Sequence, residues 1–482
     1  MTENVTSAIA QLISSCANLI DLKIFMSYNQ IRSQGLINIS QSLENCTKLE
    51  ILNLSISENN IPSNSLQYLA SRLVKCLNLK DLTLDIAFNN INDDGGVCLL
   101  YNLIKCKQLV NLKLNLNKNE LSDLKHLESQ LKDEIQTNLC NASIQIDFNQ
   151  INETGFQNLF KVLERFKNIQ RLSLSLNNNN LVLKRNGLGL VSVLSSLNKL
   201  RKLSICLLQN QICQDGLSEL IQGSTSCISL KDFQLYLSQD NLGQQEAKSL
   251  GVYLYNSRNI ENLVLSLSQS KFDDSEFQEF GNNICQNDNI KKIKLLLEQC
   301  NRGNQGIGAL TNGLGHLTNL THLDLNINEN CITSEGTYNL GFGLACCKNL
   351  QFLVLWLSAN QIGSDGILNL TQQLGKCSNL TALQLSLVKC DIGPFGSYNL
   401  GANLLNCKNL IKLDLVLGSN NIKDEGANNL FNLFRHQTLI LLSLNLQDNH
   451  ITPQAQNKMQ RQAYKMKKLA CFQAYFQFCY FI

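Results

Sequence analysis

The chain contains few residues of the kinds that interrupt a regular fold or carry chemistry. Its 482 residues include three prolines, one tryptophan and five histidines, and only 16% of them are charged. The net charge is +3, and five of the positive side chains lie together near the C-terminus, at Lys458, Arg461, Lys465, Lys467 and Lys468. Without these five, the chain carries a net charge of about −2. A nearly neutral body lacks the positive field that dominates affinity for nucleic acid, so we expect no nucleic-acid partner.

Long apolar runs are also lacking. No run approaches the roughly 20 residues that a membrane-spanning helix needs, so we expect no transmembrane segment. The first residues, Met-Thr-Glu-Asn-Val-Thr, include an acid and no base before the first apolar stretch, unlike a secretory signal. We therefore expect a cytoplasmic protein, in which the nineteen cysteines are reduced thiols. Their odd number also argues against complete pairing within the chain.

A repeat of thirty residues covers almost the whole sequence. The run Leu320–Ile332 recurs as Leu350–Ile362 and again as Leu410–Ile422. We expect the last apolar residue of each run, here called the marker, to be buried. A single solenoid over residues 1–482, with about fifteen repeats, is the organisation that this period predicts. The markers are Ile31, Ile61, Ile91, Leu121, Ile151, Leu181, Ile212, Leu242, Phe272, Arg302, Ile332, Ile362, Ile392, Ile422 and Ile451.

Each repeat contains one strand pattern and one helix pattern. Apolar residues first alternate, as at Leu353, Leu355 and Leu357, which predicts a strand. After the marker come polar residues, often a glycine, and then leucines four apart, as at Leu340 and Leu344, which predict a helix with one buried stripe. Constant strand-helix repeats stack their strands into a parallel sheet. We therefore predict an α/β horseshoe with the sheet on the concave face and the helices on the convex face.

The repeat pattern L-x-x-L-x-L-x-L-x-x-N-x-I-x-x-x-G resembles the ribonuclease-inhibitor-like class of leucine-rich repeats. The strand contains an additional residue pair, a variant that resembles repeat families expanded in ciliates. The resemblance implies a leucine-rich-repeat solenoid and says almost nothing about function. The asparagine two residues before the marker is expected to be buried and to bond neighbouring turns. These asparagines include Asn29, Asn59, Asn89, Asn119, Asn149, Asn179, Asn330, Asn360, Asn420 and Asn449.

The pattern breaks in a few repeats. A helix predicted at 122–136 places Leu124, Leu127, Leu131 and Ile135 on one face, but shifted from the frame of the other repeats. The asparagine position is occupied by Asp240, Ser270 and Cys300 in the middle repeats. Neutral drift explains these departures, and a hinge or a partner-specific surface is the alternative.

Chemical signatures are weak throughout. Eight cysteines, Cys16, Cys46, Cys76, Cys106, Cys227, Cys347, Cys377 and Cys407, share one frame position and are expected to be small buried side chains. The histidines are scattered over well-separated repeats, and Cys346-Cys347 lacks further zinc ligands. The glycines between Gly306 and Gly315 resemble a phosphate loop but lack its lysine and hydroxyl. We predict no catalytic residue, no cofactor and no metal.

The strand positions between the apolar residues project onto the concave face. The only tryptophan, Trp356, is one of them, and Phe352 and Val354 project the same way. An aromatic residue ringed by mixed charge is typical of a binding hot spot, although a tolerated large side chain is the alternative. The predicted partner-binding residues are Lys292, Lys294, His322, Asp324, Phe352, Val354, Trp356, Lys412 and Asp414.

Two functions are consistent with this pattern. The first is a scaffold that binds a protein partner of unknown identity through the concave face or the rim. The second is a GTPase-activating protein, because Ran GTPase activators use this class of repeat. Those activators usually carry an acidic segment after the repeats, whereas this chain ends in basic and aromatic residues. The scaffold is therefore the first hypothesis, and it is not an enzyme.

Residues 453–482 form a distinct C-terminal segment. A basic helix is predicted from Pro453 to Lys468, followed by a strand in the repeat frame at Leu469–Phe476 and an aromatic tail. This segment is interpreted as a cap that covers the apolar edge of the last complete repeat. Weak contact with a membrane surface is the alternative, because basic residues attract anionic lipids and aromatic residues lie at the interface.

Overall fold

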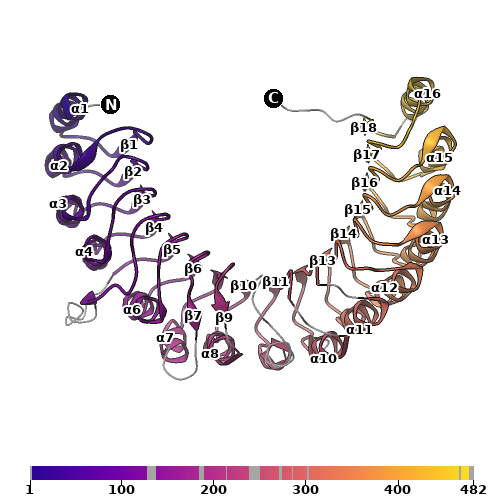
Figure 1. Cartoon of the computed structure of the whole chain (residues 1–482), viewed down its shortest axis with the longest axis horizontal. Helices are drawn as coiled ribbons and strands as arrows, with labels where there is room; N and C mark the ends of the chain where they lie inside the picture. The colour runs from indigo at the N-terminus through magenta and orange to yellow at the C-terminus, as the bar shows by residue number, and fades with distance from the viewer. Residues whose placement is uncertain are drawn as a thin grey trace. The chain divides into compact units, whose positions relative to one another are not determined.

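A computed structural model describes residues 3–127, 137–183, 189–212, 214–237, 250–253, 255–270, 274–284, 286–300, 303–465 and 468–476. The chain divides into two compact units, Met1–Asp240 and Asn241–Ile482, called the first and second unit below. Each unit is an α/β repeat solenoid in which strands and helices alternate along the chain. In each, the parallel strands line the inner side of an arc and the helices lie on its outer side (Figure 1).

The sheet of the first unit has its strands in chain order, and each strand pairs in parallel with the next. The register is offset by one repeat, so that Asp21 lies opposite Ile51 and Asp81 opposite Asn111. The strands are β1 (Asp21–Phe25), β2 (Ile51–Ser55), β3 (Asp81–Asp85), β4 (Asn111–Asn115), β5 (Asn141–Gln145), β6 (Arg171–Ser175), β8 (Lys202–Cys206) and β10 (Asp232–Tyr236). A separate short pair joins β7 (Val182–Leu183) to β9 (Gln211–Ile212).

The second unit repeats this arrangement. Its strands also pair in parallel with their neighbours in the chain, for example Leu323 with Leu353 and Leu353 with Leu383. They are β11 (Asn262–Ser266), β12 (Lys292–Leu296), β13 (His322–Asn326), β14 (Phe352–Trp356), β15 (Ala382–Ser386), β16 (Lys412–Val416), β17 (Leu441–Asn445) and β18 (Cys471–Tyr475).

The helices return the chain from one strand to the next. Those of the first unit are α1 (Glu3–Ser15), α2 (Arg32–Ser42), α3 (Ser63–Lys75), α4 (Asp93–Ile104), α6 (Glu153–Leu163), α7 (Leu190–Ser196) and α8 (Gln214–Thr225). Those of the second unit are α10 (Asp274–Ile284), α11 (Asn304–Gly315), α12 (Ser334–Cys346), α13 (Gly363–Leu374), α14 (Gly393–Asn403), α15 (Lys423–Asn429) and α16 (Pro453–Ala463). Short 3-10 segments follow three of them, at Leu43–Asn45, Leu404–Asn406 and Leu430–Arg435.

The core lies between the sheet and the helices, because strand alternation buries every second side chain. In β14, Leu353 and Leu355 are buried, whereas Phe352 is exposed and Trp356 is half-buried. The expected burial of the markers is confirmed for eleven of them, from Ile31 to Ile212 and from Ile332 to Ile422. Ile451 is only half-buried, so the prediction is wrong there, because the incomplete repeat after it supplies less cover. Leu242, Phe272 and Arg302 lie outside the described residues.

The predicted asparagine column is confirmed as a hydrogen-bonded ladder. The Oδ1 atom of Asn89 accepts hydrogen bonds from the backbone N–H groups of Asn59 and Ile61, each at 3.0 Å. Its Nδ2 atom donates to the carbonyl oxygen of Ile56 in the preceding repeat, at 3.2 Å. Asn29, in the first strand repeat that the structure describes, is half-buried, so the expected burial is wrong there. Where cysteine replaces asparagine at Cys300, the thiol donates to the carbonyl oxygen of Leu267 at 3.3 Å, and Asp240 lies outside the described residues.

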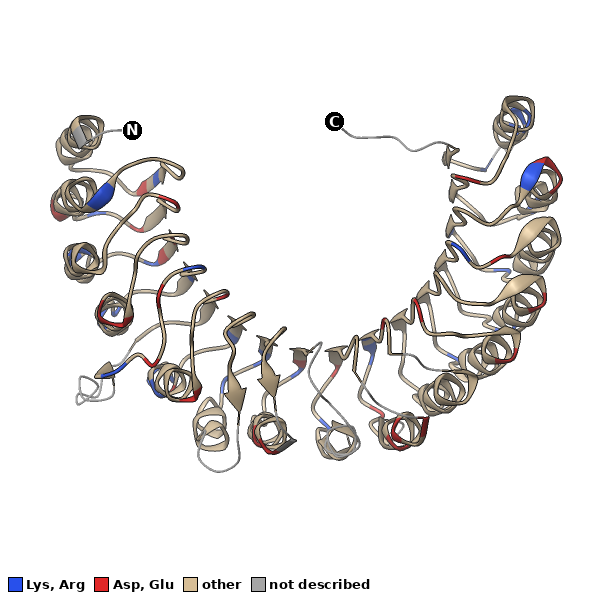
Figure 2. Cartoon of the chain, viewed as in Figure 1, with Lys and Arg blue, Asp and Glu red and all other residues tan. Residues whose placement is uncertain are grey.

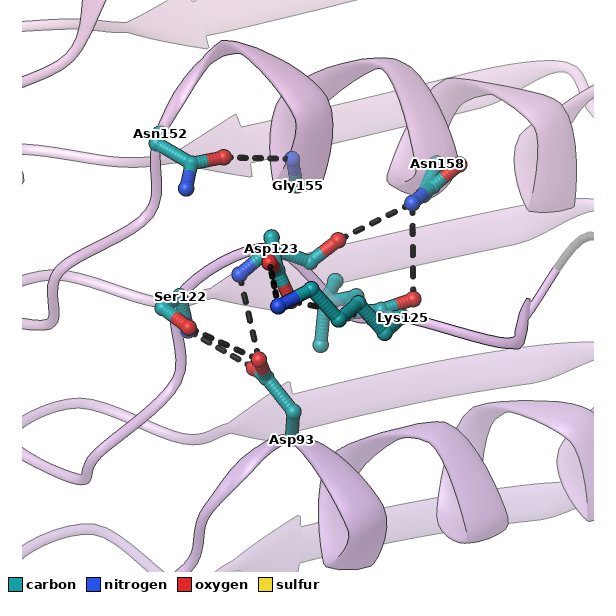
Figure 3. Close-up of polar contacts among 8 residues, drawn as sticks. Asp93, Ser122, Asp123, Lys125, Asn152, Gly155 and Asn158 are labelled. Carbon is teal, nitrogen blue, oxygen red and sulfur yellow. Dashed lines mark hydrogen bonds and ion pairs between the residues drawn. The ribbon is translucent and has the colours of Figure 1, made fainter.

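The predicted helix at 122–136 is wrong in its described part. Residues 122–126 form a loop and turn, Leu124 and Leu127 are buried, and Leu131 and Ile135 lie outside the described residues. Both carboxylate oxygens of Asp93 hold the loop: Oδ1 accepts from the Ser122 N–H and Oδ2 from the Ser122 hydroxyl, both at 2.7 Å (Figure 3). Hydrogen bonds to the preceding helix start therefore replace the missing helical ones.

Polar contacts from the following repeat hold the other side of the same loop. The Asn158 side chain donates to the carbonyl oxygen of Asp123 at 2.9 Å (Figure 3). The Asp123 carboxylate forms an ion pair with Lys125 at 2.9 Å. Although burial raises the pKa of Asp123, the hydrogen bond and charge of Lys125 outweigh it and leave that pKa below its usual range. Specific contacts from the preceding and the following repeat therefore hold this irregular loop in place.

The C-terminal segment forms a helix and one more strand. The strand predicted at Leu469–Phe476 is β18, which pairs in parallel with β17 and places Phe472 opposite Leu442. The Phe472 ring packs edge-on against Phe434, with 5.7 Å between the ring centroids. Lys467, Phe478, Tyr480 and Phe481 lie outside the described residues. Within the described ranges, no helix is long and apolar enough to cross a bilayer.

Candidate functional site

The nine predicted partner-binding residues lie on the inner strand face of the second unit. Strand register places them in three rows across the sheet. One row contains Lys292, His322, Phe352 and Lys412, with Ala382 of β15 between the last two. The next row contains Lys294, Asp324, Val354 and Asp414, and Trp356 belongs to the third. All nine are exposed or half-buried, as outward strand positions require.

The Trp356 indole is fixed by a charged neighbour from the preceding strand. Its Nε1–H donates to Asp324 Oδ1 at 3.1 Å. The other oxygen of that carboxylate pairs with the Lys294 ammonium at 2.9 Å. The Asp324 carboxylate on β13 therefore connects Lys294 of β12 with Trp356 of β14. The sequence placed these three residues near one another but did not predict these contacts. We call Lys294, Asp324 and Trp356 the Trp356 cluster.

A second aromatic contact extends the cluster along the same strands. The rings of His322 and Phe352 stack with 4.2 Å between their centroids and 16° between their planes. The Thr321 hydroxyl donates to the carbonyl oxygen of Lys291 at 3.1 Å and lies 2.8 Å from His322 Nδ1. The contact between that hydroxyl and Nδ1 holds the orientation of the imidazole ring.

The charge state of His322 suits this stacking. Burial lowers the pKa of His322, and the nearby charge of Lys292 lowers it further. The imidazole is therefore neutral near pH 7, and Phe352 stacks on an uncharged ring. Phe352 remains 40% exposed, so the pair presents an apolar surface beside the Trp356 cluster.

Lys412 and Asp414 are not in contact with the Trp356 cluster. They lie on β16, two strands from β14, with Ala382 and Gln384 of β15 between them and the aromatic residues. Two strand spacings correspond to about 10 Å. The structure therefore gathers seven of the nine predicted residues on three adjacent strands and leaves these two at the side.

Sequence analysis missed an aromatic cluster at the strand ends of the first unit. The Lys118 ammonium lies 4.5 Å from the Phe88 ring centroid and 5.1 Å from that of Phe148. The φ angles of Phe88, Lys118 and Phe148 are all positive, at 54°, 50° and 56°, and side chains of this size rarely adopt such backbone conformations. Phe88 and Phe148 are 42% and 51% exposed. They occupy the position directly before the ladder asparagine, so comparison of that single frame position would have revealed them.

The cysteine column is structural in the described residues. Seven of the eight predicted members are buried, as expected. Burial raises the pKa of Cys106, Cys227, Cys347 and Cys407 to about 12, so these thiols are unreactive near neutral pH. Cys16 is exposed, so the prediction is wrong for that residue. The other members pack against the preceding repeat, and α1 has no described helix before it.

Other chemistry-bearing residues are dispersed or used in packing. The glycines from Gly306 to Gly315 lie in or at the end of α11, where a Cβ on Gly313 would lie 2.2 Å from the Gly281 carbonyl oxygen. These glycines permit close helix packing. No group of three or more His, Cys, Asp or Glu side chains is placed to hold a metal in the part of the chain that the structure describes.

No protein-family model matches the chain, and no curated protein matches it. The repeat, the strand register and the clusters described above are therefore the basis for any functional conclusion.

Proposed function

We propose that this chain is a leucine-rich-repeat protein of the ribonuclease-inhibitor-like class and that it acts as a scaffold that binds a protein partner. The thirty-residue period, the parallel strands and the buried asparagine ladder support the class. A cytoplasmic location belongs to the proposal, because thiols such as Cys46 and Cys76 are free and buried.

The observation that carries the binding role is the fixed geometry of the Trp356 cluster. Tryptophan is enriched among residues that dominate binding energy at protein interfaces. Its indole here is held by Asp324, which in turn is held by Lys294. A partner would therefore meet an aromatic surface that is already ordered, which reduces the entropy that binding must overcome. Exposed Phe352 extends the apolar area, and Lys292 supplies a charged rim.

The charge distribution supports a protein partner over a polyanion. Along both units, Lys and Arg are interspersed with Asp and Glu (Figure 2), apart from the basic C-terminal segment 453–482. Within the cluster, the Lys294 charge is already balanced by Asp324. Mixed charge around aromatic residues matches the composition of protein interfaces, in which a fully buried centre is surrounded by a polar rim.

The test is a comparison of partners captured by matched variants. Affinity purification of the wild-type chain from cell lysate, followed by quantitative mass spectrometry, defines candidate partners. Trp356→Ala should remove a direct partner, with a loss of about 2 kcal/mol or more in binding to the purified protein. The control is Phe395→Ala on α14, which removes an aromatic side chain that is 58% exposed on the helical side of the same unit.

The stability of the two variants separates binding from folding. Trp356 is half-buried and its Asp324 partner keeps the ion pair with Lys294, so Trp356→Ala should change the free energy of unfolding by less than about 1 kcal/mol. A partner that binds wild type, Trp356→Ala and Phe395→Ala with equal affinity would remove this cluster from the interface. Acceleration of GTP hydrolysis by substoichiometric amounts of the chain would instead replace the scaffold by an activator.

A further inference from the structure

A groove with a volume of about 500 Å³ crosses the strand face of the first unit. It extends over β3, β4, β5, β6 and β8, between the outward row that begins at Asp81 and the outward row that begins at Thr83. These strands belong to repeats other than those of the Trp356 cluster. The groove is therefore a separate feature, and its existence does not depend on the function proposed for that cluster.

The groove exists because the outward side chains over its floor are short. Thr83, Ser143 and Ser173 line it at positions where the second unit has larger residues such as Lys294 and Val354. The strand backbone around Leu112 and Ala142 is therefore part of the lining. The main-chain N–H and C=O groups of these strands pair with neighbouring strands, so hydroxyl and amide side chains supply the hydrogen-bonding groups of this face.

An amide ladder polarises one wall of the groove. The Asn111 side chain donates to Asp81 Oδ1, and the Asn141 side chain donates to Asn111 Oδ1 at 2.6 Å. Each amide nitrogen carries two hydrogens, so one N–H of each asparagine remains for a ligand. The single acidic residue of the lining, Asp81, is thus bonded within the wall.

Three basic side chains converge on the groove. Arg171 and Lys202 stand at one end of the row that begins at Asp81, and Lys113 stands on the other row. Among the described residues none of the three forms an ion pair with an acid, whereas Lys23 and Lys294, at the strand position of Lys113, are paired with acids at 3.0 and 2.9 Å. The lining therefore has three positive charges and one negative charge.

We propose that this groove binds an extended acidic peptide segment of a protein partner. From β3 to β8 it crosses four strand spacings, or about 19 Å, which is the length of roughly six extended residues. Carboxylates of the peptide pair with Arg171, Lys202 and Lys113, and the Arg171 guanidinium can hold one of them through two parallel hydrogen bonds. Backbone groups of the peptide bond to the asparagine amides and to the hydroxyls of Ser143 and Ser173.

A peptide fits the lining better than a single-stranded nucleic acid. Proteins that bind single strands combine basic grooves with aromatic side chains on which the bases stack. The thirteen lining residues include no aromatic side chain. Their amides and hydroxyls match a peptide backbone, which has a donor and an acceptor at nearly every residue.

The test uses fluorescence anisotropy with a fluorescein-labelled hexaglutamate peptide at about 50 mM NaCl, where charge pairing is only partly screened. Wild type should bind saturably. Arg171→Gln combined with Lys202→Gln should weaken binding by at least about tenfold, because it removes charge-assisted hydrogen bonds. Ser143→Phe, which keeps every charge and fills the groove, should weaken it to a similar degree.

A matched control changes the charge without touching the groove. Lys48 and Lys107 are exposed residues of the first unit in turns that lead from a helix to a strand. Lys48→Gln combined with Lys107→Gln should leave affinity within about twofold of wild type, because neither side chain lines the groove and solvent screens exposed charges that make no direct contact with the ligand. Melting temperatures verify folding, and Lys113→Gln carries the charge test if the double variant at Arg171 and Lys202 does not fold.

Three outcomes would overturn the proposal. Equal weakening by the control pair would reduce the binding to a general charge effect. Wild-type affinity in Ser143→Phe would show that the groove is not occupied. Tighter binding of a labelled six-nucleotide oligothymidylate than of hexaglutamate would assign the groove to nucleic acid. The Trp356→Ala variant should bind hexaglutamate like wild type, so failure here is distinguishable from failure of the function proposed for the Trp356 cluster.

Discussion

Removal of one ladder asparagine should destabilise its repeat strongly, and Asn360→Ala is the sharpest case. The Asn360 side chain is 4% exposed. Its Oδ1 atom accepts from the backbone N–H groups of Asn330 at 3.0 Å and Ile332 at 2.9 Å. Its Nδ2 atom donates to the carbonyl oxygens of Ile327 at 3.0 Å and Leu357 at 2.8 Å. One side chain therefore satisfies backbone groups of two repeats.

The expected loss follows from those contacts. Alanine leaves two buried N–H groups, those of Asn330 and Ile332, without an acceptor, at about 1 to 3 kcal/mol each. The Leu357 carbonyl still accepts from the Cys390 thiol at 3.2 Å, so less is lost on the carbonyl side. We expect a total of roughly 4 kcal/mol. Asn360→Cys, which copies the thiol donor of Cys390, should lose less than Asn360→Ala.

Hydrogen exchange measured by mass spectrometry is the appropriate assay, because long repeat arrays need not unfold in one step. Peptides that span residues 328–334 contain both orphaned amides, and their exchange should accelerate by about a thousandfold. The control is Asn379→Ala, which removes an exposed side chain with one hydrogen bond of 2.8 Å, to the Lys348 carbonyl oxygen. Protection in Asn360→Ala no lower than in this control would refute the assignment of the ladder as a stabilising element.

Three further predictions follow from burial and from the C-terminal strand. Burial lowers the pKa of His436, whose Nε2–H donates to the Cys407 carbonyl oxygen at 3.1 Å. The unfolded chain therefore binds more protons once the pH falls below about 6.5, and stability decreases toward the folded pKa. The melting temperature should drop more between about pH 7 and pH 5.5 in wild type than in His436→Gln, and equal slopes would contradict this. Deletion of residues 469–482 removes β18 and should lower the melting temperature and increase binding of an apolar dye; loss of liposome binding at unchanged stability would instead favour a membrane anchor. Alkylation of the native protein, mapped by peptide mass spectrometry, should modify the exposed thiols of Cys16, Cys331 and Cys471 first. Equally early labelling of the buried thiols would contradict the packing; these are Cys106, Cys227, Cys347 and Cys407.

The strands, the markers and the asparagine ladder were predictable because each depends on the spacing of residues within a repeat and on contacts between equivalent residues of adjacent repeats. Alternation at Leu353, Leu355 and Leu357 decides which side of the strand is buried, and the thirty-residue spacing brings equivalent residues into register. Predictions failed where a repeat lacks a regular neighbour. Cys16 and Ile451 occupy the expected positions of the repeat, but the described structure packs a complete repeat against only one side of each. Cys16 is therefore exposed and Ile451 is half-buried.

The irregular loop after Leu121 was not predictable from periodicity. Leucines spaced as in a helix are buried at Leu124 and Leu127, but the backbone there is held by Asp93, far away in sequence, and by Asn158. Hydrophobic spacing reports which side chains are buried. It does not report which hydrogen bonds their backbone makes, because those partners come from other repeats.

By itself the sequence determined the repeat, the direction in which each strand side chain projects and the list of residues on the inner face. Tertiary structure decided which of those residues act together. The indole of Trp356 meets Asp324 thirty-two residues earlier and the rings of His322 and Phe352 stack, whereas Lys412 lies on a strand too distant to join them. The groove on the first unit extends over five strands and depends on the short side chains Thr83, Ser143 and Ser173 of three of them, a combination that no single repeat contains. Adjacent strands are about 4.8 Å apart, so outward side chains of neighbouring repeats are in contact although they are about thirty residues apart in the sequence. The helix that connects the two strands lies on the opposite face of the solenoid.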